Sequence, residues 1–128
     1  MVAEEHFVFE DGAALGVIRV RRTTRPFNTI SELEAAFDRL NAHFSKFTRK
    51  EMGLVMDLRA GSVRNDPVFE SALERKRKVT LAGFRRVALL VQTSLGVLQC
   101  ERHARIDGIP YFVTMSEASA LRHITPDE

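Results

Sequence analysis

Three short apolar runs, each followed by a segment of helical character, constrain the fold of this chain more than any other feature. The runs cover residues 52–58, 86–92 and 109–114. Continuous apolar runs of this length are typical of strands that are covered on both faces. Strands that alternate with helices form a largely parallel sheet, because each helix carries the chain back across a face of the sheet. We therefore expect an α/β fold.

The start of the chain predicts an antiparallel hairpin. Two segments rich in β-favouring residues, 6–10 and 14–22, flank the pair Asp11-Gly12, which is typical of tight turns. The hairpin adds one antiparallel strand to the sheet. It is inconsistent with a simple receiver-type fold, which begins with a parallel strand-helix unit.

The first helix is the most clearly marked element. It is expected to begin at Ser31, which forms a capping box with Glu34 in the segment SELE. Apolar residues then recur at helical spacing and predict a helix of about four turns that packs one face on the sheet. The residues of this stripe are Leu33, Phe37, Leu40, Phe44 and Phe47.

Capping residues mark the remaining helices. Asp66-Pro67 begins the second helix, because aspartate accepts hydrogen bonds from free amides and proline tolerates the first turn. This helix is expected to end near Leu81, before Gly83. The third helix is expected to begin at Thr93 or Ser94, and Ser116 caps the fourth. The strand at 109–114 contains Pro110, which favours an edge position.

Composition supports one globular domain. The chain has 128 residues, of which 45% are hydrophobic and 28% charged, enough for a core without metal or disulfide. We expect a single domain over residues 1–128, with its core at about 6–124 and the element order β-β-α-β-α-β-α-β-α. The single cysteine, Cys100, and the absence of any long apolar run predict a cytoplasmic protein without a membrane span.

The element order and two short segments resemble the STAS family. The segments are VMDL (55–58), which leads into a loop and a capped helix, and YFVTMSEASAL (111–121) near the end. STAS members include anti-sigma-factor antagonists and the cytoplasmic tails of sulfate transporters, and a STAS-like branch holds bacterial proteins that resemble lipid-binding folds. The resemblance implies a mixed, mostly parallel sheet with helices packed against it. It also implies a bacterial regulatory or scaffold module without enzyme activity.

The phosphorylation switch of the antagonist members is not expected in this chain. In those members an Asp-Ser pair follows the Asp-Leu of the strand by eight residues, and a partner kinase phosphorylates the serine. Counted from Asp57, the matching positions here are Asn65 and Asp66, so aspartate replaces the serine. Aspartate places a fixed negative charge at the helix amino terminus, where the free amides stabilise it.

The loop after the strand at 52–58 is the expected contact surface for a partner protein. Carboxyl ends of parallel strands share one edge of a sheet, so the start of the third helix belongs to the same surface. Its two arginines suit carboxylates or phosphates, although no glycine-rich nucleotide loop is present. The candidate residues are Arg59, Ser62, Arg64, Asn65, Asp66, Thr93 and Ser94.

Two further binding modes stay open. The nine phenylalanines, without any tryptophan, leave room for an apolar cavity under the first helix, which would make the protein a carrier of a small apolar molecule or lipid. The segment 73–86 carries six basic residues against one acidic residue. Consecutive basic residues on a helix do not share one face. Together with Arg85 and Arg86 they leave open a basic patch for an acidic partner or an anionic lipid, and we expect no nucleic-acid partner. A homodimer is compatible with either mode.

The sequence contains no recognisable catalytic or metal-binding set. Cys100 and His103 can touch on a helix but have no third group to orient them. Asp57 is interpreted as a turn residue that binds loop amides. The histidines lie in separate elements without the spacing of metal ligands, at His6, His43, His103 and His123. We therefore expect no enzyme activity, no metal and no cofactor.

Overall fold

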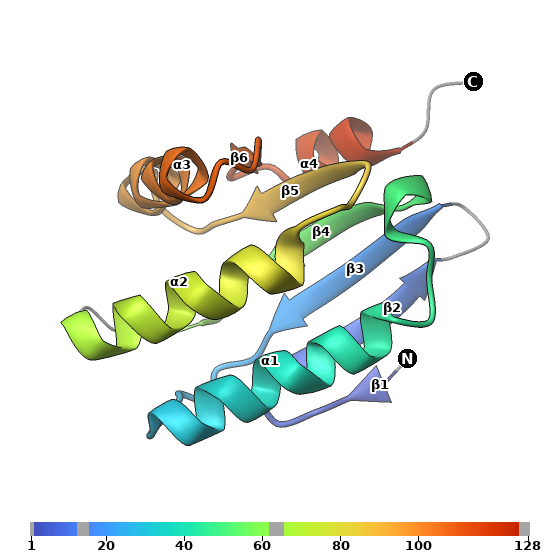
Figure 1. Cartoon of the computed structure of the whole chain (residues 1–128). Helices are drawn as coiled ribbons and strands as arrows, with labels where there is room; N and C mark the ends of the chain where they lie inside the picture. Colours follow the sequence, from blue (N-terminus) through green and yellow to red (C-terminus); the bar gives the residue numbers. More distant parts are fainter. Residues whose placement is uncertain (1, 13–15, 62–65, 126–128) are drawn as a thin grey trace.

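A mixed sheet forms the centre of the molecule (Figure 1). This computed structural model describes residues 2–12, 16–61 and 66–125. Over these residues the sheet has six strands in the order of the sequence. Along the sheet, the first two pairs of neighbouring strands are antiparallel and the following three pairs are parallel. The strands are β1 (Val2–Ala3), β2 (Phe7–Gly12), β3 (Val17–Arg22), β4 (Gly53–Asp57), β5 (Arg86–Leu90) and β6 (Phe112–Thr114).

Helices cover the two faces of the sheet unequally. The described residues form α1 (Ile30–Phe44), α2 (Pro67–Leu81), α3 (Ser94–Asp107) and α4 (Glu117–Ile124), with one 3-10 turn, η2 (Arg49–Glu51). Figure 1 shows α1 and α2 on one face and α4 on the other. None of these helices is long and apolar enough to cross a membrane.

Alternate residues of the central strands β3, β4 and β5 face two separate cores. Ile18 and Leu54 point to the larger core, under α1 and α2. Val55 and Leu90 point to the smaller core, under α4. A side chain at Gly53 would collide with the carbonyl oxygen of Ile124, so this glycine allows the end of α4 to pack directly on β4.

The predicted turn at Asp11-Gly12 is wrong. Both residues belong to β2, where they pair with Ile18 and Val17 of β3. Continued pairing satisfies backbone groups that an early turn would leave without partners. Gly16 has a φ of 71°, in the left-handed region that glycine adopts without strain. The chain therefore reverses later than the Asp-Gly signal indicates.

The predicted start of the first helix is also wrong by two residues. Thr29, not Ser31, caps α1: its side-chain oxygen accepts a hydrogen bond of 3.1 Å from the amide of Glu32. The Glu32 carboxylate accepts one of 3.1 Å from the amide of Asn28. The segment from Thr29 to Glu32 has the same spacing as SELE and begins earlier. Phe47 lies beyond the helix but still packs against the larger core.

The other predicted caps are confirmed. Asp66 accepts a hydrogen bond of 3.1 Å from the amide of Phe69 at the start of α2. Thr93, the first of the two alternatives, caps α3, and Ser116 caps α4. The strand β6 lies at the edge of the described sheet, as predicted.

Candidate functional site

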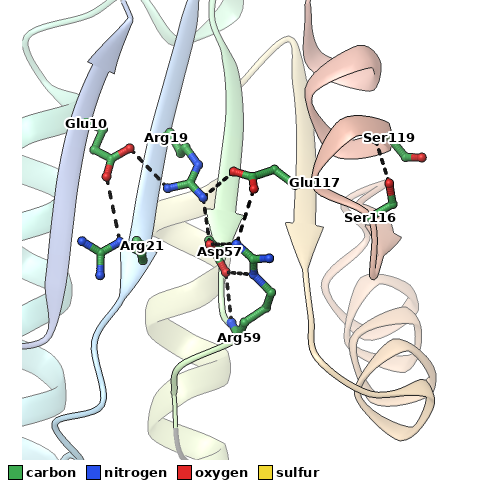
Figure 2. A network of polar contacts seen from close by, with 8 residues as sticks. All are labelled: Glu10, Arg19, Arg21, Asp57, Arg59, Ser116, Glu117 and Ser119. Carbon is green, nitrogen blue, oxygen red and sulfur yellow. Dashed lines mark hydrogen bonds and ion pairs between the residues drawn. The ribbon is translucent and has the colours of Figure 1, made fainter.

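A network of charged side chains lies on the α4 face of the sheet (Figure 2). At its centre, the Asp57 carboxylate is only 2% exposed at the end of β4. It accepts hydrogen bonds from the amide of Arg59 at 3.1 Å and from two nitrogens of the Arg59 guanidinium at 3.0 and 2.8 Å. Arg19 of β3 donates a further hydrogen bond of 2.9 Å. Asp57 thus binds a loop amide, as predicted, and also two guanidinium groups.

The network extends from β2 to α4. Arg19 contacts Glu117 at 2.7 Å and Glu10 at 3.2 Å. Arg59 lies 3.6 Å from the second carboxylate oxygen of Glu117. Figure 2 shows these side chains in one layer across β2, β3 and β4. Because Glu117 is the first residue of α4, the network connects this helix to the sheet.

The network sets the ionisation of its central carboxylate. Burial alone would raise the pKa of Asp57, but the hydrogen bonds and charge of Arg59, together with the charge of Arg19, outweigh burial and hold the pKa below its usual value. The same contacts with Asp57 raise the pKa of Arg59. Arg59 is therefore engaged within the fold and is not a free loop cation.

The residues predicted as a partner surface have different roles in the structure. Asp66 and Thr93 cap helices, and Ser94 is the first residue of α3. The carboxyl ends of the parallel strands β4 and β5 bring these residues to the same edge of the sheet as Arg59. Ser62, Arg64 and Asn65 lie outside the described residues.

Exposed apolar side chains lie near the amino-terminal ends of α2 and α3. Val68 in the first turn of α2 is 61% exposed, and Leu95 and Leu98 at the start of α3 are 65% and 63% exposed. The sequence pattern did not single them out. A signal for them was that apolar residues recur only weakly at helical spacing in the segment 93–105, because a helix with few core positions leaves its other apolar side chains on the surface.

A cavity of about 680 Å³ lies between the sheet and the three helices α1, α2 and α3; we call it the helix cavity. Its apolar wall includes Phe37 of α1, Phe69 and Leu73 of α2, and Leu89 of β5. Polar and charged side chains also line it, at Arg22, Asn28, Arg59, Arg77, Gln92, Thr93, Gln99 and His103. A cavity under the first helix was the alternative that the sequence left open. The observed one also extends under α2 and reaches α3.

An ion pair joins α2 to α3 beside the helix cavity. Arg77, which is 8% exposed, donates hydrogen bonds of 2.5 and 2.9 Å to the two oxygens of Asp107. The hydroxyl of Tyr111 donates one of 2.9 Å to the same carboxylate. Burial and the bond to Asp107 raise the pKa of Tyr111, so the phenol keeps its proton. This set holds the two helices at a fixed separation.

The basic segment at 73–86 does not form one patch. Lys76 contacts Asp38 at 2.9 Å, and Lys78 contacts Glu74 at 3.3 Å. Arg77 binds Asp107, as described above. These cations therefore belong to separate intramolecular pairs.

Cys100 and His103 lie together on the wall of the helix cavity. Burial raises the pKa of the Cys100 thiol, and burial followed by the charge of Arg77 lowers the pKa of His103. Both groups are therefore neutral at pH 7. A neutral thiol is a poor nucleophile and a poor metal ligand. In the part of the chain that the structure describes, no group of three or more His, Cys, Asp or Glu side chains is placed to hold a metal.

Comparison with known proteins identifies the fold of this chain. No family model and no curated protein matches the chain. The chain is similar to a solved structure of an uncharacterised DUF3478-family protein with a SpoIIAA-like fold from Shewanella loihica. The match covers 97% of this chain and 98% of the Shewanella chain. The two are 14% identical and superpose with a TM-score of 0.63. The α/β prediction and the resemblance to STAS proteins are thereby confirmed at the level of fold: this chain has a SpoIIAA-like, STAS-like fold.

Proposed function

We propose that this protein is a non-enzymatic regulatory module that binds a small molecule with an apolar body in the helix cavity. The cavity itself carries the proposal. Its volume of about 680 Å³ lies within the range of about 300–1,000 Å³ that is typical of small-molecule sites. Its wall is mainly apolar, with phenylalanine and leucine as the commonest side chains, and it also presents polar and charged groups; a mainly apolar wall with polar groups is usual for such sites.

The state of Cys100 supports a binding role over a catalytic one. A cysteine nucleophile needs a lowered pKa and a neighbouring base. Here burial raises the pKa of Cys100, and the nearby Arg77 is already paired with Asp107. We also propose that the protein is bacterial and cytoplasmic. The lone cysteine supports this location, because thiols stay reduced in the cytoplasm.

The second candidate function is contact with a partner protein at the carboxyl edge of the sheet. STAS-like folds are often protein-interaction modules. The observation that favours this function is the exposure of Val68, Leu95 and Leu98 at that edge, since exposed apolar groups are enriched where proteins bind one another. The predicted contact residue Arg59 is also 38% exposed in its side chain.

Native mass spectrometry of protein purified from cells separates the two candidates. A retained small molecule supports the cavity function, whereas a retained polypeptide supports the partner function. A neutral fluorescent probe, N-phenyl-1-naphthylamine, then tests the cavity directly. We expect it to bind the wild type and to bind Leu73→Trp weakly, because the larger side chain fills the cavity.

A matched variant controls for changes on α2. Val79 lies on the same helix and is 62% exposed, so Val79→Trp adds the same side chain outside the cavity. We expect Val79→Trp to bind the probe like the wild type. If the wild type does not bind the probe, or if both tryptophan variants bind it equally well, the cavity is not a ligand site.

A further inference from the structure

A buried cation lies at the wall of the helix cavity. Arg22, the last residue of β3, is 6% exposed and lines the cavity. Its guanidinium carbon lies 4.2 Å from the centroid of the Phe27 ring and 5.6 Å from that of Phe7. One terminal nitrogen donates hydrogen bonds to the carbonyl oxygens of His6, at 3.1 Å, and Thr23, at 3.0 Å. These contacts fix the plane of the guanidinium.

The remaining edge of the guanidinium has no hydrogen-bond partner among the residues that the structure describes. Over the described residues, neither Nε nor the second terminal nitrogen of Arg22 has a hydrogen-bond acceptor, and no carboxylate forms an ion pair with it. Glu32 is the acidic side chain nearby, but it binds the amide of Asn28 and lies 3.8 Å from His6. Arg22 differs in this from the half-buried Arg19, which contacts three carboxylates.

Arg22 keeps its charge in this position. Burial lowers its pKa to about 10, so the guanidinium is still a cation at pH 7. Burial, and then the charge of Arg22, lower the pKa of the neighbouring His6, so His6 is neutral and adds no second charge. A buried charge without a counter-ion is costly. An anion in the cavity would offset this cost.

The other arginines that line the helix cavity do not compete for such an anion. Arg59 is bound to Asp57, and Arg77 is bound to Asp107. His103 also lines the cavity, but it is neutral at pH 7 because its pKa is lowered. Of the described cations at the cavity wall, Arg22 alone has no carboxylate partner. The cavity therefore offers one positive site beside a long apolar wall.

We propose that the ligand of the helix cavity is an amphipathic anion, with a carboxylate or phosphate group bound by the free edge of Arg22 and an apolar body lying along Phe37 and Phe69. This inference rests on the proposed cavity function and names its ligand class. The planar guanidinium suits both groups, because its parallel N–H bonds match pairs of oxygens on a carboxylate or a phosphate. The stacked Phe27 ring keeps water from one face of the guanidinium and so strengthens the bond.

Displacement of N-phenyl-1-naphthylamine tests this ligand class at pH 7. The competitors are decanoate, decyl phosphate and uncharged decan-1-ol, with acetate and inorganic phosphate as anions that have no apolar body. We expect decanoate or decyl phosphate to bind the wild type at least about tenfold more tightly than decan-1-ol, because a hydrogen-bonded charge adds this much affinity. The stronger of the two anions identifies the head group.

Two variants locate the charge. Arg22→Met should weaken binding of the preferred decyl anion by roughly 10- to 100-fold and leave decan-1-ol almost unchanged. Arg21→Met is the control. Arg21 precedes Arg22 on the same strand, but its side chain is 42% exposed and contacts Glu10. We expect Arg21→Met to bind every competitor like the wild type.

The outcomes distinguish failure of the anion inference from failure of the cavity function. Equal affinity of the wild type for decan-1-ol and the decyl anions overturns the anion inference and leaves the cavity function intact. Binding of acetate or inorganic phosphate as tightly as the decyl anions overturns the role of the apolar body. Failure of the wild type to bind the probe overturns both proposals. If Arg22→Met does not fold, the comparison of charged with uncharged competitors on the wild type still decides whether the cavity prefers an anion.

Discussion

Replacement of Asp57 by asparagine tests how much the charge network contributes to the fold. Asp57 accepts four hydrogen bonds, three from Arg59 and one from Arg19. Removal of one member of a buried ion pair costs about 3–5 kcal/mol, because the other charge stays buried without a partner. Here Arg19 keeps Glu10 and Glu117, and Arg59 is 38% exposed. We therefore expect Asp57→Asn to lower the free energy of unfolding by about 2–3 kcal/mol at pH 7.

The pH dependence of this loss follows from the direction of the pKa shift. The pKa of Asp57 is lower in the folded protein than the value of about 3.9 in an unfolded chain. Its contribution to stability is thus fully present above pH values near 4, and it is lost as the pH falls through the folded pKa. The variant has no such group. The difference between wild type and Asp57→Asn should therefore narrow as the pH falls below about 4.

Urea denaturation of both proteins from pH 7 down to about pH 3.5 measures this difference. Glu10→Gln is the matched control, since Glu10 belongs to the same network but its side chain is 36% exposed. It should cost less than about 1 kcal/mol. Two results would refute the reasoning: a variant within about 0.5 kcal/mol of the wild type at pH 7, or a difference that stays constant as the pH falls.

Three further predictions test the packing and the caps. Leu40→Ala should destabilise the fold by about 2–5 kcal/mol, because Leu40 is 2% exposed, whereas the exposed Lys46→Ala should cost under about 0.5 kcal/mol; equal urea midpoints would contradict the packing of α1. Gly53→Ala should lower the melting temperature, because its Cβ would collide with the Ile124 carbonyl; an unchanged melting temperature would contradict the packing of α4 on β4. Asp66→Ala should cost about 1 kcal/mol and Asp66→Ser much less; similar losses of thermal stability in both would show that the cap does not stabilise α2.

Local hydrogen bonds explain why much of the fold was predictable. Asp66, Thr93 and Ser116 each cap a helix by accepting a bond from an amide three residues ahead, so the signal and its partner lie within one short segment. The apolar runs likewise predicted strands, because burial on both faces requires apolar residues at every position. The Asp11-Gly12 turn failed because strand pairing depends on a partner strand, and β2 and β3 continue to pair through these residues.

The sequence by itself determined the fold class, the alternation of strands and helices after the first hairpin, and the caps of α2, α3 and α4, since these depend on neighbours a few residues apart. Only the tertiary structure decided the site. Arg19 and Glu117, which lie 98 positions apart, meet across the sheet, and the successive arginines Arg21 and Arg22 point to opposite faces of β3. The side chain of Arg21 is 42% exposed, whereas Arg22 is buried at a cavity wall. Identical side chains acquire different roles because burial and distant partners, which no local pattern encodes, decide whether a charge is hydrated, paired or left open to a ligand.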